Sequence, residues 1–147
     1  MTQNTNNTMN MTEADKAQLR LLDIQKVAIA ISIYSSLLLY KSTLEGIELI
    51  YSRYRKDIDE VNIPNPDATA IKAVSLGFLS QAMITKIAYS KYNILYTQYI
   101  NGEFKYSLKP NMDINIGNTL ALISYFYIMR GLEGIYRRTV QQPILGV

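Results

Sequence analysis

The chain has 147 residues, 48% of them hydrophobic, and a formal charge of +3 from 15 basic and 12 acidic side chains. This size fits one domain with a real core, and the small positive excess does not by itself indicate nucleic-acid binding. Because cysteine and histidine are both absent, the sequence excludes disulfides, thiolate nucleophiles and zinc–sulfur sites, and it lacks the commonest general base.

The first segment, residues 1–11, is polar and has no apolar periodicity, which predicts a flexible tail. It lacks the basic and apolar regions of a signal peptide, so we expect an intracellular protein. The residue choice favours Asn, Ile, Lys and Tyr, whose codons are AT-rich. An AT-rich genome, such as that of a low-GC bacterium or its phage, is therefore expected.

A long first helix is predicted from Thr12 to about Ile58. Thr12 is a hydroxyl cap with Asp15 three residues on, which resembles a capping box. No proline interrupts the segment, and Ser35-Ser36 is the point at which a kink or a split would give four helices. The apolar stripe of this helix, at steps of three, four or seven, comprises Leu22, Ile29, Ile33, Leu37, Tyr40, Leu44, Ile47, Tyr51 and Tyr54.

Two further helices follow. The segment NIPNPD, 62–67, ends the first helix, and Asn65 with Pro66 begins a second one that runs to Ile100 and stops at Asn101-Gly102. After a short connection, Asp113 or Asn115 is expected to cap a third helix that ends near residue 140. The predicted fold is an all-α antiparallel bundle of three long helices in a single domain, 12–140, with a C-terminal tail, 141–147.

Each predicted helix has an uncharged middle, at 27–40, 73–85 and 114–129. These stretches are shorter than the roughly 20 residues of a membrane span, and the mean hydropathy is only −0.01. A soluble bundle is therefore the preferred interpretation. Lysines that border the stretches could lengthen a span by snorkelling, so a small membrane protein with three short spans is the alternative.

The sequence LEGI occurs twice, at 44–47 and 132–135. Glu45 and Glu133 could form a carboxylate pair for acid–base or metal chemistry if the fold placed them together. The structural interpretation, which we prefer, is that they form ion pairs with Lys41 and Arg137 four residues away. The basic residues after each copy lie near helix C-termini, where positive charge complements the helix dipole.

Twelve tyrosines and some arginines suggest interaction surfaces, because tyrosine is enriched at protein interfaces. The candidate interaction residues, which ordinary core-edge packing would explain about as well, are Tyr51, Tyr54, Tyr89, Tyr92, Tyr96, Tyr99 and Tyr136. A candidate basic patch for nucleic acid comprises Arg53, Arg55, Lys56, Arg137 and Arg138. Asp57, Asp59 and Glu60 follow directly and cancel much of that charge, which makes nucleic acid an unfavoured partner.

The sequence predicts no catalytic residue, metal or cofactor, since no phosphate-binding loop, nucleophile motif or ligand cluster occurs in it. The leading hypothesis is a non-enzymatic structural or interaction subunit that self-associates or docks on a larger assembly, such as a phage particle or a spore. The alternatives are the membrane protein and a nucleic-acid-associated helical protein. The expected location is intracellular or within an assembled particle, with the membrane as the alternative.

Overall fold

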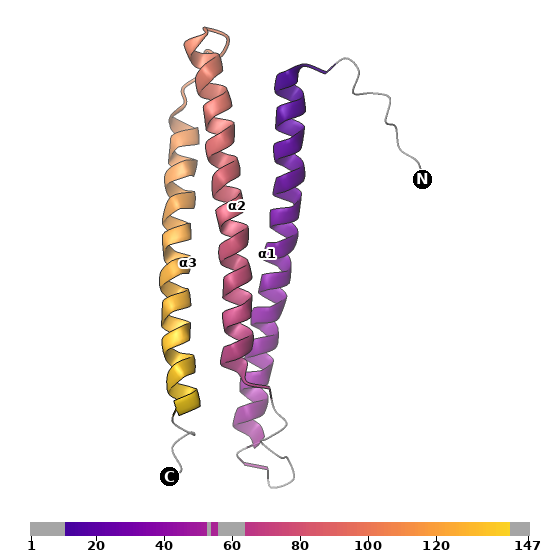
Figure 1. Ribbon diagram of the computed structural model, residues 1–147, viewed down its shortest axis with the longest axis vertical. Coiled ribbons are helices and arrows are strands. Elements are labelled where there is room, and N and C mark those ends of the chain that lie inside the picture. The colour runs from indigo at the N-terminus through magenta and orange to yellow at the C-terminus, as the bar shows by residue number, and fades with distance from the viewer. Residues whose placement is uncertain (1–10, 53, 56–63, 142–147) are drawn as a thin grey trace, which may run out of the picture.

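The computed structural model describes residues 11–52, 54–55 and 64–141, the last three of them by their backbone only. Three helices make up the fold: α1 (Glu13–Ser52), α2 (Pro66–Ile100) and α3 (Lys109–Gln141). They run antiparallel in chain order, and α2 packs against both of the others, whereas α1 and α3 scarcely touch (Figure 1). The described residues contain no strand. The predicted all-α bundle of three long helices is therefore confirmed.

Side-chain caps begin the first two helices as predicted. The Thr12 hydroxyl accepts a hydrogen bond from the Asp15 amide at 3.1 Å and donates one to the Asp15 carboxylate at 2.7 Å. Asn65 Oδ1 accepts from the Asp67 amide at 2.9 Å, and Pro66 occupies the first turn. Gly102, at φ +74°, follows the end of α2, in the left-handed conformation that glycine adopts without steric cost.

Two predicted helix ends are wrong, and one open possibility is settled. The split that the sequence allowed at Ser35-Ser36 does not occur, since α1 is one continuous helix. The first helix was predicted to run to about Ile58, but it ends at Ser52, and Tyr54 and Arg55 follow it outside the helix. The third helix, α3, begins at Lys109, so Asp113 and Asn115 are inside the helix and do not cap it. Ser107 Oγ accepts from the Lys109 amide at 3.2 Å instead.

Small polar side chains hold α1 against α2. Ser35 Oγ donates to the Ala73 carbonyl and Ser80 Oγ donates to the Ala28 carbonyl, both at 2.7 Å. Near the start of α2, Ser42 Oγ donates to the Pro66 carbonyl, also at 2.7 Å. A serine side chain is short, so each contact requires the two helix backbones to lie close together. The α1–α2 interface thus contains close serine-to-backbone contacts at three points along the two helices.

The distribution of apolar side chains is the reverse of that in an ordinary globular core. Five hydrophobic residues of the described chain are buried, and three of them are alanines: Ala28, Ala70, Ala73, Val74 and Ile87. In the same part of the chain thirty large hydrophobic residues are exposed, on all three helices and on the segments that follow α1 and α2. A monomeric soluble protein rarely exposes contiguous apolar area on this scale. The monomer therefore leaves most of its large apolar surface without a protein partner.

Candidate interaction surface

The apolar stripe of α1 faces away from the rest of the molecule. An amphipathic helix normally turns such a stripe toward the core, but here the buried residues of α1 are Ala28, Ser35, Ser42, Glu45 and Ser52. At about 100° per residue, the stripe lies on the opposite side of the helix from these five. Every residue of the stripe is exposed: Leu22, Ile29, Ile33, Leu37, Tyr40, Leu44, Ile47, Tyr51 and Tyr54.

The candidate tyrosines do not form one surface. Tyr51 and Tyr54 are exposed at the C-terminal end of α1, whereas the stripe on α2 lies toward the opposite end of the bundle (Figure 1). Tyr92 and Tyr96 stack with ring centroids 5.9 Å apart. The stripe on α2 consists of the exposed Tyr89, Tyr96 and Tyr99 together with the half-buried Tyr92, and the remaining candidate, Tyr136, is half-buried on α3.

One tyrosine of the α2 stripe also has an internal role. The Tyr89 hydroxyl lies 3.1 Å from Thr119 Oγ1 on α3, and Thr119 in turn donates to the Asn115 carbonyl at 2.8 Å. Tyr89 therefore ties α2 to α3 as well as contributing exposed surface. A substitution of Tyr89 would alter both, so this residue is a poor probe of an external contact.

The candidate basic patch is described only in part. Arg55, Arg137 and Arg138 are exposed, and the ends of α1 and α3 that carry them point toward the same end of the bundle (Figure 1). Arg55 lies over the Tyr51 ring at 5.9 Å from its centroid, and Arg138 Nε donates to the Gly134 carbonyl. Arg53 and Lys56 lie outside the described residues, as do the three acidic residues that follow.

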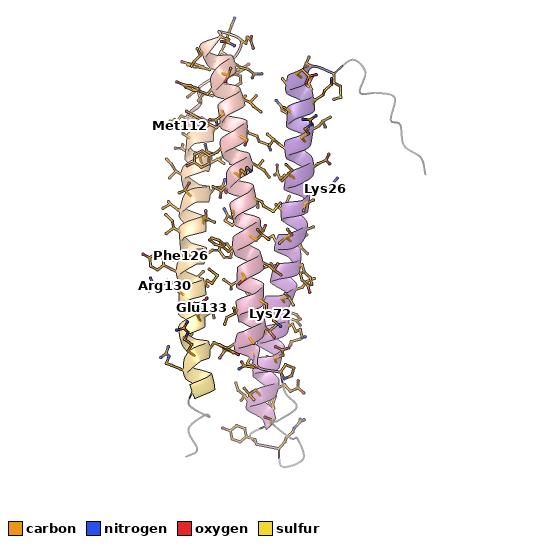
Figure 2. All side chains as sticks on the ribbon, in the orientation of Figure 1. Lys26, Lys72, Met112, Phe126, Arg130 and Glu133 are labelled. Atoms are coloured by element: carbon orange, nitrogen blue, oxygen red, sulfur yellow. The ribbon has the colours of Figure 1, made fainter. Side chains whose placement is uncertain are left out.

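The two copies of LEGI occupy different environments. Glu45 is buried on α1 and forms an ion pair with Lys41 at 3.5 Å, as expected, but neither of its carboxylate oxygens has a hydrogen-bond partner. Glu133 is exposed on α3 (Figure 2). Its predicted ion pair with Arg137 is not formed in the described part of the chain. Since α1 and α3 scarcely touch, the fold does not build a carboxylate pair from these residues.

Sequence reasoning missed a cluster of side-chain amides between α2 and α3. Gln81 Nε2 donates to Asn118 Oδ1 at 3.1 Å and to the Asn118 carbonyl at 3.3 Å. Thr85 Oγ1 donates to the Gln81 carbonyl at 2.7 Å and lies 3.4 Å from the Asn118 carbonyl. Asn115 is buried, and its Oδ1 has no partner. The steps of four and three from Asn111 through Asn115 to Asn118 could have revealed this polar face of α3.

Two half-open cavities lie between the three helices, and the second of them, which Asn115 and Asn118 help to line, adjoins this cluster. They measure about 270 and 200 Å³, and Lys91 and Asn111 line both of them. Lys91 Nζ donates to Gln25 Oε1 at 2.8 Å, so the lysine links α2 to α1 across the groove. Apolar residues form much of the walls of the two cavities, among them Leu22 and Leu95 in the first and Ile114 in the second.

No group of three or more acidic residues that could hold a metal ion occurs among the residues described. Comparisons with models of known protein families, with curated proteins and with solved structures found no match to this chain. We therefore look for function on the surface of the molecule, where the exposed apolar stripe of α1 is a long and regular feature.

Proposed function

We propose that this protein is a non-enzymatic structural subunit that self-associates or joins a larger protein assembly through its apolar helix faces. One observation carries the proposal: the regular stripe of α1, from Leu22 to Tyr51, is exposed throughout. Burying apolar surface is the main driving force of protein association. An association that covers this stripe would bury large apolar side chains that the monomer leaves exposed.

The extent of the exposed surface supports protein as its cover. Exposed large apolar residues of α1 run from Leu19 to Tyr51, a length of roughly 48 Å at about 1.5 Å per residue. The hydrocarbon core of a bilayer is roughly 30 Å thick. Exposed charges interrupt the same stretch at Asp23, Lys26 and Glu48. A protein partner can accommodate charges along an extended surface, whereas a bilayer covers one uncharged belt.

The alignment of α1 with α2 makes the uncharged layer that a bilayer could cover thin. Ser35 contacts Ala73, so Lys72 lies beside the middle of the uncharged stretch of α1. Lys26 and Lys72 (Figure 2) thus bracket a shared uncharged layer of about ten residues, or roughly 15 Å. Arg130 on α3 lies toward the same end as Lys72. Snorkelling would have to double the thickness of this layer to match a bilayer.

A membrane protein is the second candidate, and two specific observations favour it. By length and composition, α1 and α2 could each cross a membrane, and only 11% and 33% of their most apolar windows are buried in the bundle. In addition, interfaces of small residues and serine hydroxyls are typical of helices packed within lipid. This candidate differs from the first in what covers the apolar faces, so fractionation separates them.

The test is expression without detergent, an alkaline wash of the membrane fraction, and size-exclusion chromatography with light scattering. Protein found in the soluble fraction at a discrete multiple of 16.7 kDa is the expected result. Protein that stays in the washed membranes and becomes monodisperse only in detergent would support the second candidate. A soluble, monodisperse monomer at high concentration would contradict both.

A further inference from the structure

Within the exposed stripe of α1, the spacing is that of a coiled-coil seam. From Ile33 to Tyr51 the steps alternate strictly between four and three residues, which is a heptad repeat of the a and d type. We define the α1 seam as Ile33, Leu37, Tyr40, Leu44, Ile47 and Tyr51. Their exposed fractions range from 46% to 64%. Within the described chain, no second helix packs on the seam, since α2 lies on the opposite side of α1.

We infer that the α1 seam binds the α1 seam of a second copy of this chain, in antiparallel orientation. This inference rests on the proposed self-association and specifies its geometry. A seam with two apolar positions per heptad is complementary to itself, and each side chain fits between four residues of the facing helix. Because α2 and α3 lie behind α1, two copies can meet at their seams without a clash between the remaining helices.

Charges beside the seam select the orientation. The position after each d residue, which flanks the seam on one side, holds Tyr34, Lys41 and Glu48 in turn. In an antiparallel pair these flanking positions face one another, so a lysine can meet a glutamate of the second copy. In a parallel pair they face the other flank, which holds Ser36, Thr43 and Ile50. The antiparallel arrangement alone therefore forms ion pairs across the seam.

The same charges select the register. When Tyr40 faces Tyr51 of the second copy, Lys41 faces Glu48 of the second copy, and the symmetry of the pair forms this contact twice. A shift of one heptad in one direction places Lys41 opposite Lys41 of the second copy. A shift in the other direction places Glu48 opposite Glu48 of the second copy. Like charges placed opposite each other disfavour a pairing. One register thus satisfies the apolar layers and the flanking charges together.

Both charged residues are available for this contact in the monomer. The Lys41 side chain is 63% exposed, and in the described part of the chain its ion pair is the long one with Glu45 at 3.5 Å. Glu48 is exposed and takes part in none of the ion pairs of the described chain. A second copy would therefore supply the partner of Glu48 without breaking a short internal contact.

Cysteine cross-linking tests the geometry directly, because the natural chain contains no cysteine. Two full-length variants, Tyr40→Cys and Tyr51→Cys, are oxidised separately and as an equimolar mixture. Antiparallel pairing in this register places these two positions opposite each other, so disulfide-linked dimers should form in the mixture and not with either variant alone. Efficient cross-linking of Tyr40→Cys with itself would indicate a parallel pair and overturn the inference.

Charge reversal gives an independent test in solution. Glu48→Lys should raise the dissociation constant of the dimer about tenfold, since it places Lys41 opposite a second lysine twice, near the middle of the seam. The double variant Lys41→Glu/Glu48→Lys should restore wild-type affinity. Glu133→Lys, on an exposed face of α3, is the matched control and should leave the affinity unchanged. If the double variant is as weak as the single one, the predicted pairing is wrong.

The two proposals fail in different ways. A wild-type protein that is a monodisperse monomer contradicts self-association, and the seam pairing falls with it. A wild-type oligomer that shows no cross-link in the mixture, with Glu48→Lys as tight as wild type, leaves self-association standing and overturns only the α1 pairing. Circular dichroism of each variant, which should match the helical content of the wild type, confirms that any lost association does not reflect unfolding.

Discussion

Gly77 of α2 and Tyr125 of α3 are in such close contact that no side chain fits between them. A Cβ atom on Gly77 would lie 2.7 Å from Tyr125 Cε1 and 3.1 Å from Ser35 Oγ on α1. Gly77 is therefore the point at which residues of all three helices meet. The absence of a side chain there lets one tyrosine ring bridge the gap between α3 and the α1–α2 pair.

Gly77→Ala should destabilise the bundle despite the better helix propensity of alanine. Overpacking typically costs about 1–3 kcal/mol, while replacing a mid-helix glycine gains up to about 1 kcal/mol. We expect a net loss of about 1 kcal/mol in the free energy of unfolding, measured by chemical denaturation. Gly131→Ala is the control, because nothing lies within 4 Å of that position, and it should be neutral or stabilising. A stabilised Gly77→Ala variant would contradict the close contact.

The serine contacts between α1 and α2 should each contribute measurably to stability. Ser35→Ala and Ser80→Ala remove buried hydrogen bonds of 2.7 Å to backbone carbonyls of the facing helix. Each should lower the free energy of unfolding by about 1 kcal/mol. Ser36→Ala removes only a bond to the carbonyl of Ser32 in its own helix, so it should have little effect. Equal effects of all three would indicate that the interhelical bonds are not the stabilising element.

Replacing the buried carboxylate of Glu45 by an apolar side chain should stabilise the fold. Glu45 is only 5% exposed, its oxygens lack hydrogen bonds, and its ion pair with Lys41 is long. Buried charges of this kind often cost more in desolvation than they gain, and apolar replacements are neutral or stabilising by about 1–4 kcal/mol. Glu45→Met should therefore unfold at a higher denaturant concentration than wild type. Glu133→Met, at an exposed position, is the comparison and should change little.

Two asparagines one turn apart on α3 should respond in opposite ways to the same substitution. Asn115 Oδ1 is buried without a partner beside a cavity of about 200 Å³, so Asn115→Leu removes an unsatisfied group and has room for the larger side chain. Asn118 Oδ1 accepts from Gln81, so Asn118→Leu takes away a partner. We expect shifts of about 1 kcal/mol in each direction. Thermal unfolding of both variants under identical conditions measures the difference.

Local sequence signals determined where the helices begin and end. Thr12, Asn65 with Pro66, and Gly102 are caps or stops whose effect depends on neighbouring residues alone, and the structure has each where it was predicted. The start of α3 was wrong by one turn. Asp113 and Asn115 are good capping residues, but the Ser107 hydroxyl accepts a hydrogen bond from the first amide of the helix instead. Local preference alone does not decide which of several nearby candidates begins the helix.

Which face of each helix is buried was decided only by the tertiary structure. α1 is apolar over much of its circumference, so periodicity alone favoured its face of large side chains. The folded chain instead buries Ala28, Ser35 and Ser42, because small side chains allow the backbones of α1 and α2 to approach within hydrogen-bonding reach of a serine. The large side chains of the α1 seam remain outside, where association with another molecule can cover them. The sequence by itself thus specified the three helices and most of their ends, while packing between distant residues determined which face of each helix is exposed.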